Sequence, residues 1–150
     1  MKLELVTPVG IKLSEEVYEV VLPTTDGEIT VLPKHEPLVT LLSEGVMAVR
    51  RSRTDTEPEH FAVERGIAEI NGETIRILTD EAVTGDEIVE NEIQAALANA
   101  QKMQSQAKTH IELEEAKKLV NRQTARLRVA ELHRRHRPHR RSNDGKIFNK

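Results

Sequence analysis

Hydrophobic residues in the first 84 positions occur in short runs that alternate with polar residues, and turn residues separate these runs. Successive side chains of a β-strand point to opposite faces of its sheet, so this pattern predicts strands. The runs begin at Leu3, Val17, Ile29, Leu38, Val46, Phe61, Ile67 and Ile75. Many short strands with regularly spaced turns predict an all-β sandwich or barrel over residues 1–84.

Asn71-Gly72 is the strongest hairpin signal of this region, because it lies between two alternating runs. We expect a type I′ turn there, since such a turn requires a positive φ at both central residues and Asn-Gly tolerates it. Further turn signals are Thr7-Pro8, Asp26-Gly27, Glu44-Gly45 and Arg65-Gly66.

From residue 85 onward the hydrophobic period becomes helical. An apolar stripe with alternating spacings of four and three residues predicts a first helix, with Asp86 as its N-cap. The stripe consists of Val89, Ile93, Ala96, Ala100, Met103 and Ala107.

A second helix is predicted directly after the first. Thr109 and Glu112 have the spacing of a capping box, and Pro138 ends the helix because its ring blocks the preceding turn. Its stripe consists of Leu113, Ala116, Val120, Gln123, Leu127 and Ala130. Two helices joined by one or two residues form an antiparallel hairpin, here over residues 85–137. Burial of apolar surface contributes ~25 cal/mol per Å², and the Ala-rich seam between the two helices buries little apolar area. We therefore expect a hairpin that docks, opens or rearranges.

Composition excludes several classes of site. The chain of 150 residues has no cysteine, which excludes disulfides, thiol catalysis and cysteine-based metal sites. No phosphate-binding loop, zinc-protease motif or nucleophile elbow is present, so we predict no catalytic site and no metal site. The N-terminus lacks the apolar segment of a signal peptide. No apolar run approaches the ~20 residues of a membrane helix, so any membrane contact is expected to be indirect or peripheral.

Charge separates the two ends of the chain. Residues 1–84 hold 8 basic and 16 acidic residues, whereas residues 119–150 hold 10 basic and 2 acidic residues. We interpret residues 138–150 as a disordered, solvated basic tail, with an acidic protein partner as the second interpretation. Metal binding by His133, His136 and His139 is disfavoured, because five interleaved arginines repel a divalent ion. Nucleic acid binding through counterion release is a weaker alternative, because no aromatic residue lies nearby to stack on bases.

Arg122, Arg126 and Arg128 differ from the tail because they lie on a predicted helix. Arg122 and Arg126 are four residues apart and therefore share a face. An ordinary exposed helix face is one interpretation. The other is docking onto carboxylates or phosphates, which guanidinium groups bind with two parallel hydrogen bonds.

The segment from Gly27 to Thr40 reads GEITVLPKHEPLVT. It resembles the signature of ATP synthase epsilon subunits, in which a glycine and two hydrophobic positions precede P-x-H-x-P-L. Residues 66–70, 78–82 and 126–132 also resemble this family, and the resemblance covers about residues 2–134. It agrees with the order of strands and helices derived above.

The resemblance implies a ten-stranded β-sandwich at the foot of the central stalk, against the gamma subunit and the c-ring. The corner at Gly27 and Glu28 is then expected to face the c-ring, and His35 to lie near the gamma contact. Pro33 and Pro37 stiffen the loop around His35 by fixing φ.

The family also implies a switching role for the hairpin. Folded down, it lies against the sandwich; extended, its basic helix reaches the catalytic head formed by the alpha and beta subunits. Arg122, Arg126 and Arg128 would there meet acidic segments and block rotation in the hydrolysis direction.

Some members of the family bind ATP on the folded hairpin through an I-D-x-x-R-A pattern. The aligned residues here are IELEEA, in which Glu112 replaces aspartate and Glu115 replaces arginine. A carboxylate at Glu115 repels phosphate, although Arg122 and Arg126 match family ATP contacts. We therefore expect weak or absent ATP binding and no other cofactor.

These observations together predict a non-catalytic rotor and regulatory subunit of a proton-translocating F-type ATP synthase. We expect it at the cytoplasmic face of a bacterial membrane, held there through the complex, with no nucleic acid partner. The alternatives are a nucleic-acid-binding β protein with a basic tail and a free-standing enzyme.

Overall fold

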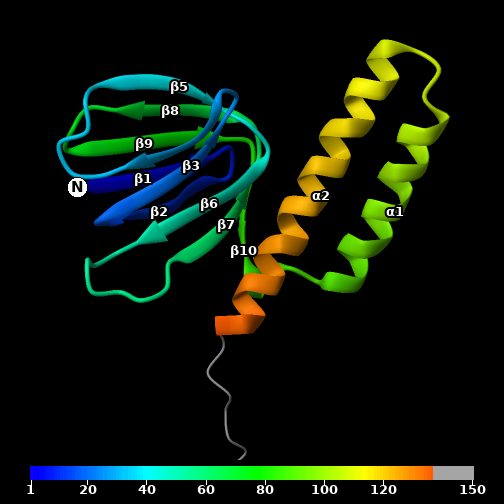
Figure 1. Ribbon diagram of the computed structural model, residues 1–150. Coiled ribbons are helices and arrows are strands. Elements are labelled where there is room, and N and C mark those ends of the chain that lie inside the picture. The colour runs from blue at the N-terminus through cyan, green and yellow to red at the C-terminus, as the bar shows by residue number, and fades with distance from the viewer. Residues whose placement is uncertain (137–150) are drawn as a thin grey trace, which may run out of the picture.

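The computed structural model describes residues 1–136. Ten strands are followed by two helices (Figure 1). The strands are β1 (Lys2–Thr7), β2 (Gly10–Glu16), β3 (Glu19–Thr24), β4 (Gly27–Val31), β5 (Leu38–Leu42), β6 (Gly45–Arg50), β7 (Glu59–Val63), β8 (Gly66–Ile70), β9 (Thr74–Thr79) and β10 (Ala82–Thr84). A short 3-10 turn, η1 (Gly85–Glu87), leads to α1 (Glu90–Gln106) and α2 (His110–His136). The predicted fold class, a ten-stranded β-sandwich followed by a helical pair, is confirmed.

The strands follow the order β10-β7-β6-β3-β5-β8-β9-β1-β2, and β4 pairs with β3. β1 runs parallel to β9, whereas the other strand pairs of the described chain are antiparallel. The core between the layers is aliphatic, as the alternation predicts. Its largest fully buried side chains include Leu3, Leu5, Leu22, Met47, Ile75 and Ile77.

Two local predictions are wrong in their detail. The Asn71-Gly72 hairpin forms, but φ is positive at Gly72 and not at Asn71, so the turn is not type I′. Instead, the Asn71 side chain accepts a hydrogen bond from the Thr74 N–H at 2.9 Å. Asp86 is not the N-cap of the first helix, because it lies inside η1 and α1 begins only at Glu90. Thr84 precedes η1, and its N–H donates to the Glu87 carboxylate at 2.7 Å.

The two helices form an antiparallel pair and pack against each other. Ala100, Ala116, Gln123 and Ala130 of the predicted stripes are buried. The predicted capping box is half formed, because the Glu112 N–H donates to Thr109 Oγ1 at 3.1 Å while the Glu112 carboxylate accepts from the Lys108 N–H. Within the described residues, neither helix is both long and apolar enough to cross a membrane. Arg137 and the predicted tail 138–150 lie outside the described residues.

α2 lies between α1 and the β-sandwich (Figure 1) and packs on β6, β7, β10 and η1. It therefore has a second buried face, which the single predicted stripe does not include. Ala125 and Val129 on this face pack against Ala62, and Val46, Val83 and Ile88 surround them. The hairpin is thus docked on the sandwich through an apolar seam.

Candidate functional site

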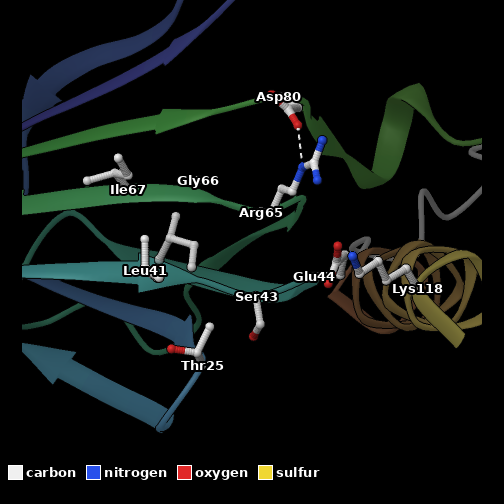
Figure 2. A pocket seen from close by; sticks show the side chains of 10 residues that line it. Thr25, Leu41, Ser43, Glu44, Arg65, Gly66, Ile67, Asp80 and Lys118 are labelled. Atoms are coloured by element: carbon white, nitrogen blue, oxygen red, sulfur yellow. Dashed lines mark hydrogen bonds and ion pairs between the residues drawn. The ribbon is translucent and has the colours of Figure 1, made fainter. Parts of the chain in front are cut away.

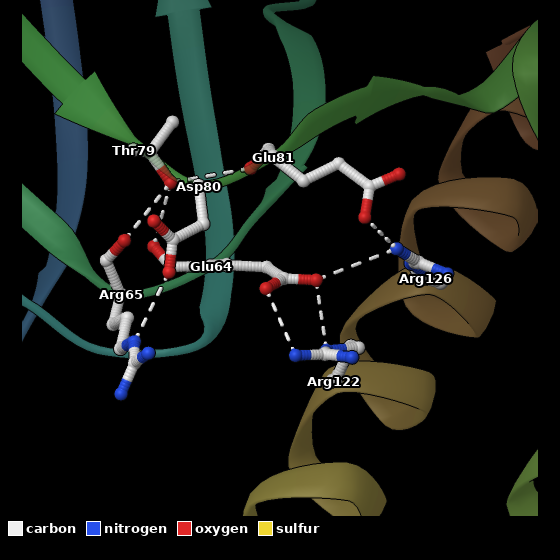
Figure 3. Close-up of polar contacts among 7 residues, drawn as sticks. All are labelled: Glu64, Arg65, Thr79, Asp80, Glu81, Arg122 and Arg126. Carbon is white, nitrogen blue, oxygen red and sulfur yellow. Dashed lines mark hydrogen bonds and ion pairs between the residues drawn. The ribbon is translucent and has the colours of Figure 1, made fainter. Parts of the chain in front are cut away.

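Glu64 anchors the docked hairpin, at the point where β7 ends. Its side chain is buried, and its two carboxylate oxygens face the guanidinium of Arg122 on α2 (Figure 3). Arg122 Nη2 donates to Oε2 at 2.9 Å, and Arg122 Nε lies 2.8 Å from Oε1. Arg126 lies one turn further along α2, with its Nη2 3.5 Å from Glu64 Oε1. Two arginines of the helix therefore share one carboxylate of the sandwich.

Glu81 completes this cluster from the other side. Its carboxylate accepts a hydrogen bond from Arg126 (Figure 3). Burial raises the pKa of the Glu64 carboxyl above its ordinary value; Arg122 opposes this rise and Glu81 adds to it. An anionic Glu64 therefore depends on the arginines of α2 for its stabilisation.

Thr79 holds the backbone segments that carry the two glutamates. Its buried hydroxyl lies 3.0 Å from the Glu64 carbonyl oxygen and 3.2 Å from that of Glu81, and it donates to one acceptor at a time. Arg65 Nε donates to Asp80 Oδ2 at 3.0 Å and ties the same two segments together at the surface. The acidic side of the cluster is therefore built by the sandwich alone.

The structure separates the other predicted hairpin residues from this cluster. Arg128 pairs with Glu131 of its own helix at 3.3 Å, and its side chain is 52% exposed. Glu112 lies ten residues before Arg122, or about 15 Å along the helix axis. Arg122 and Arg126 therefore lie together in the cluster at Glu64, whereas Glu112 and Arg128 lie outside it.

The predicted rotor-docking residues lie at the two ends of β4. Gly27 begins the strand with a φ of 112°, and the Glu28 side chain beside it is exposed. The loop that contains Pro33, His35 and Pro37 follows the other end of the strand. It is fixed there by backbone hydrogen bonds from Lys34 to Gly72 at 3.0 Å and from His35 to Leu32 at 3.1 Å.

An apolar face that sequence reasoning missed lies on β5, β8 and β9. Leu41, Ile67 and Leu78 are cross-strand neighbours in one row, and Val39 lies two residues from Leu41. The exposed fractions are 70% for Val39, 57% for Leu41, 41% for Ile67 and 44% for Leu78. The run Leu-Val-Thr-Leu-Leu in β5 was the available signal, because its four apolar residues fall on both faces of the strand.

A groove of about 480 Å³ adjoins this apolar face (Figure 2). Leu41 and Ile67 line it from the sheet, Arg65 and Asp80 from the strand ends, and Lys118 from α2. The groove therefore joins apolar and charged groups at the boundary between sandwich and hairpin. Among residues 1–136, no group of His, Asp or Glu side chains has the geometry of a metal site.

Comparisons with known proteins agree with this architecture. Residues 1–85 match the family model described as the ATP synthase, Delta/Epsilon chain, beta-sandwich domain. The ATP synthase epsilon chain of Gloeobacter violaceus is 34% identical over 130 residues, which are 87% of this chain and 96% of the relative. That of Rhizobium meliloti is 39% identical over 113 residues, which are 73% and 83% of the two chains.

Solved structures extend the likeness to the helices. A chain of the Euglena gracilis mitochondrial ATP synthase, solved as OSCP, F1 and c-ring, has a TM-score of 0.73 and 25% identity, covering 86% of this chain and 79% of its own. A chain of the Tetrahymena thermophila enzyme, solved as central stalk and c-ring, has a TM-score of 0.59 and 14% identity, covering 87% and 96%. The second likeness concerns the fold alone.

Proposed function

The chain belongs to the family of ATP synthase epsilon chains, and we propose that its β-sandwich docks on the rotor of that enzyme while its helical hairpin restrains ATP hydrolysis. It is a non-catalytic subunit of a membrane-associated rotary enzyme.

The apolar face of Val39, Leu41, Ile67 and Leu78 supports docking on the gamma subunit. Contiguous exposed apolar side chains mark protein–protein contacts, and the cores of such contacts are depleted of charge. The hairpin docks on β6, β7 and β10 and leaves this face open. The adjoining groove offers a place for a segment of the partner, with Arg65 and Lys118 available for ion pairs.

The Gly27–Glu28 corner and the loop of Pro33, His35 and Pro37 supply two further docking points in this proposal. The corner is the start of β4 and the loop follows its end, so the sandwich can contact the c-ring with the corner and the gamma subunit with the loop. Two prolines and the hydrogen bond from Lys34 to Gly72 hold the loop in one conformation. A preorganised loop loses less conformational entropy when it docks.

The arginine–glutamate cluster supports the restraining role of the hairpin. Arg122 and Arg126 already bind two carboxylates in the docked state. An acidic segment of the alpha or beta subunits must therefore bind these arginines more strongly than Glu64 and Glu81 do, because a partner shifts an equilibrium only by its differential affinity. The hairpin restrains hydrolysis when it is released, and Glu64 opposes that release.

ATP binds weakly or not at all to the docked hairpin in this proposal. Arg122 and Arg126 are occupied by carboxylates, and Glu115 adds a further negative charge to α2. The same pairing gives no support to the nucleic acid alternative. Isothermal titration calorimetry with Mg-ATP tests the proposal, and micromolar affinity contradicts it.

We place the chain at the cytoplasmic face of a bacterial membrane, held there by its partners. Co-sedimentation with membranes tests this. We expect the chain to sediment with membranes that contain the rest of the enzyme and to remain in the supernatant when gamma is absent.

ATP hydrolysis by an epsilon-depleted enzyme tests the hairpin role, with full-length chains added back. We expect Glu64→Gln to increase inhibition, because it removes the carboxylate that Arg122 and Arg126 share and so weakens docking. Arg128 does not contact the arginine–glutamate cluster, so Arg128→Glu should leave that cluster intact and act on the released hairpin. We therefore expect it to decrease inhibition. Glu92→Gln, at an exposed position of α1, is the matched control. If Glu64→Gln and Arg128→Glu both bind the enzyme and leave hydrolysis at the control level, the hairpin has no restraining role.

A further inference from the structure

The foot of the hairpin, which we define as residues His133–His136 at the end of α2, meets the sandwich through histidine side chains. The rings of His60 on β7 and His136 on α2 are stacked, with a centroid distance of 6.4 Å and an interplanar angle of 22°. His136 Nε2 also lies 2.8 Å from Glu57 Oε2, in the segment just before β7. These contacts are separate from the arginine–glutamate cluster.

A polar cavity of about 110 Å³ lies at this foot. His60, His133 and His136 line it together with Glu59 and Asp86. Within the described residues, His133 Nε2 is buried without a hydrogen-bond partner. The docked state therefore partly buries His60 and His133 and restricts their hydration, whereas His136 is exposed.

Titratable and charged side chains approach His60 from α2 and from the segment before β7, and Glu59 and Asp86 line the same cavity. His136 and Arg128 approach it from α2, and Glu57 faces it from the segment before β7. Burial lowers the pKa of His60 below its ordinary value, and His136 and Arg128 lower it further, whereas Glu57 opposes them. Protonation of His60 would place a cation against the stacked ring of His136 and near the guanidinium of Arg128.

The linkage between protonation and docking follows from this arrangement. The docked His60 binds a proton less readily than the released His60, whose pKa is about 6.5. Docking therefore has its full stability above about pH 6.5 and loses stability as the pH falls below that value, because the released state binds more protons.

We propose that His60 and His136 form a pH-sensitive latch, which releases the foot of the hairpin from the β-sandwich as the environment acidifies. The latch does not depend on where the released arginines act. The ratio of released to docked molecules should rise by at most about tenfold for each pH unit below about 6.5, the limit for uptake of one proton.

One other titratable group of the interface acts in the opposite sense. Glu64 has a raised pKa in the docked state, so protonation of Glu64 as the pH falls through that raised pKa favours docking. A release that increases on acidification therefore cannot come from Glu64.

The test measures the hairpin-to-sandwich distance in the full-length chain by double electron–electron resonance. The chain has no cysteine, so two introduced cysteines carry the only spin labels. These are Glu73→Cys, on the exposed β8–β9 turn, and Lys108→Cys, between the helices. Spectra at several values between pH 8 and pH 5.5 are compared for the otherwise unaltered chain, His60→Gln, and the control His110→Gln. His110 begins the same helix as His136 but lies at its other end.

Release that increases on acidification in the unaltered chain and His110→Gln, but not in His60→Gln, supports the latch. A distance distribution independent of pH in the unaltered chain overturns it, as does the same pH response in His60→Gln. If circular dichroism shows that His60→Gln does not fold, NMR titration of the His60 ring replaces the distance measurement on that variant. His60 should then titrate at lower pH in the unaltered chain than in a chain whose foot is displaced by Gly85→Ala; equal titration overturns the latch.

Discussion

The guanidinium of Arg122 on α2 faces both carboxylate oxygens of Glu64 on β7, although the two residues are 58 positions apart in the sequence. Arg126 and Glu81 extend this pair into a cluster of four charged side chains. The cluster, the apolar seam of Ala125 and Val129, and the histidine contact at the foot lie along one face of α2. Docking of the hairpin thus has three chemically different components, which substitutions can separate.

Glu64→Gln should weaken docking without unfolding the sandwich. It removes the anion that two arginines share, and we expect a loss of about 1–3 kcal/mol, less than for a fully buried pair because Arg122 is partly exposed. Hydrogen exchange of α2 amides measures the loss. Exchange as slow as in Glu69→Gln would contradict the assigned role of Glu64.

Val129→Ala should open the apolar seam. Val129 is fully buried against the sandwich, and removal of two methyl groups from such a site costs about 1–2.5 kcal/mol. Limited proteolysis between β10 and α1 should become faster, while the thermal midpoint of the sandwich should change little. Thr124→Ala, on the exposed side of the same helix, serves as control, and equal proteolysis of the two variants would exclude the seam as a docking element.

Gly85→Ala should displace the foot of the hairpin. A Cβ at Gly85 would lie 2.2 Å from Cβ of His133, so α2 must move away or the turn must distort. Paramagnetic or fluorescent distance probes between α2 and β7 should report this displacement. Gly66→Ala offers the contrasting case: its Cβ would lie 2.0 Å from the backbone oxygen of Leu78, and the sandwich itself should lose stability. If Gly85→Ala leaves the distance unchanged, the close approach of His133 to η1 does not exist in solution.

Leu41→Glu should abolish docking on the gamma subunit and leave the isolated chain folded. The side chain is 57% exposed, so the substitution should alter the free energy of unfolding by no more than about 0.5 kcal/mol. In the complex it would bury a charge in an apolar contact. Affinity for gamma is measured by surface plasmon resonance, with Ile111→Glu on α2 as control. Equal affinity of the two variants would show that gamma does not bind the apolar face.

Local patterns in the sequence predicted the strands and helices of this fold, but they did not predict the contacts between elements that are distant in the sequence. The alternation before residue 84 and the helical stripes after it follow from local geometry. The spacing of Ala125 and Val129 did contain the signal of a second buried face, but one apolar pair is weak evidence beside a complete stripe. The partner of Arg122 could not be derived, because Glu64 is one of 16 acidic residues before residue 85 and only the docked packing selects it.

The detailed turn predictions were wrong for a related reason. Asn71 can adopt a positive φ, but its side chain instead caps the backbone of Thr74, and local rules allow both arrangements. Asp86 has the chemistry of an N-cap, as does Thr84, whose N–H is bound by Glu87. Choices between equivalent local solutions are made by the neighbouring strands and by the position of α2.

The parallel pairing of β1 with β9 sets the order in which the molecule is completed during its synthesis. β1 leaves the ribosome before β9, because Leu3 lies 72 positions ahead of its partner Ile75. At roughly 5–20 residues per second, β1 therefore waits about 4–14 s for this partner. During that interval it has β2 alone as an adjacent strand, and the nascent sheet keeps an open edge that a chaperone or another chain can reach.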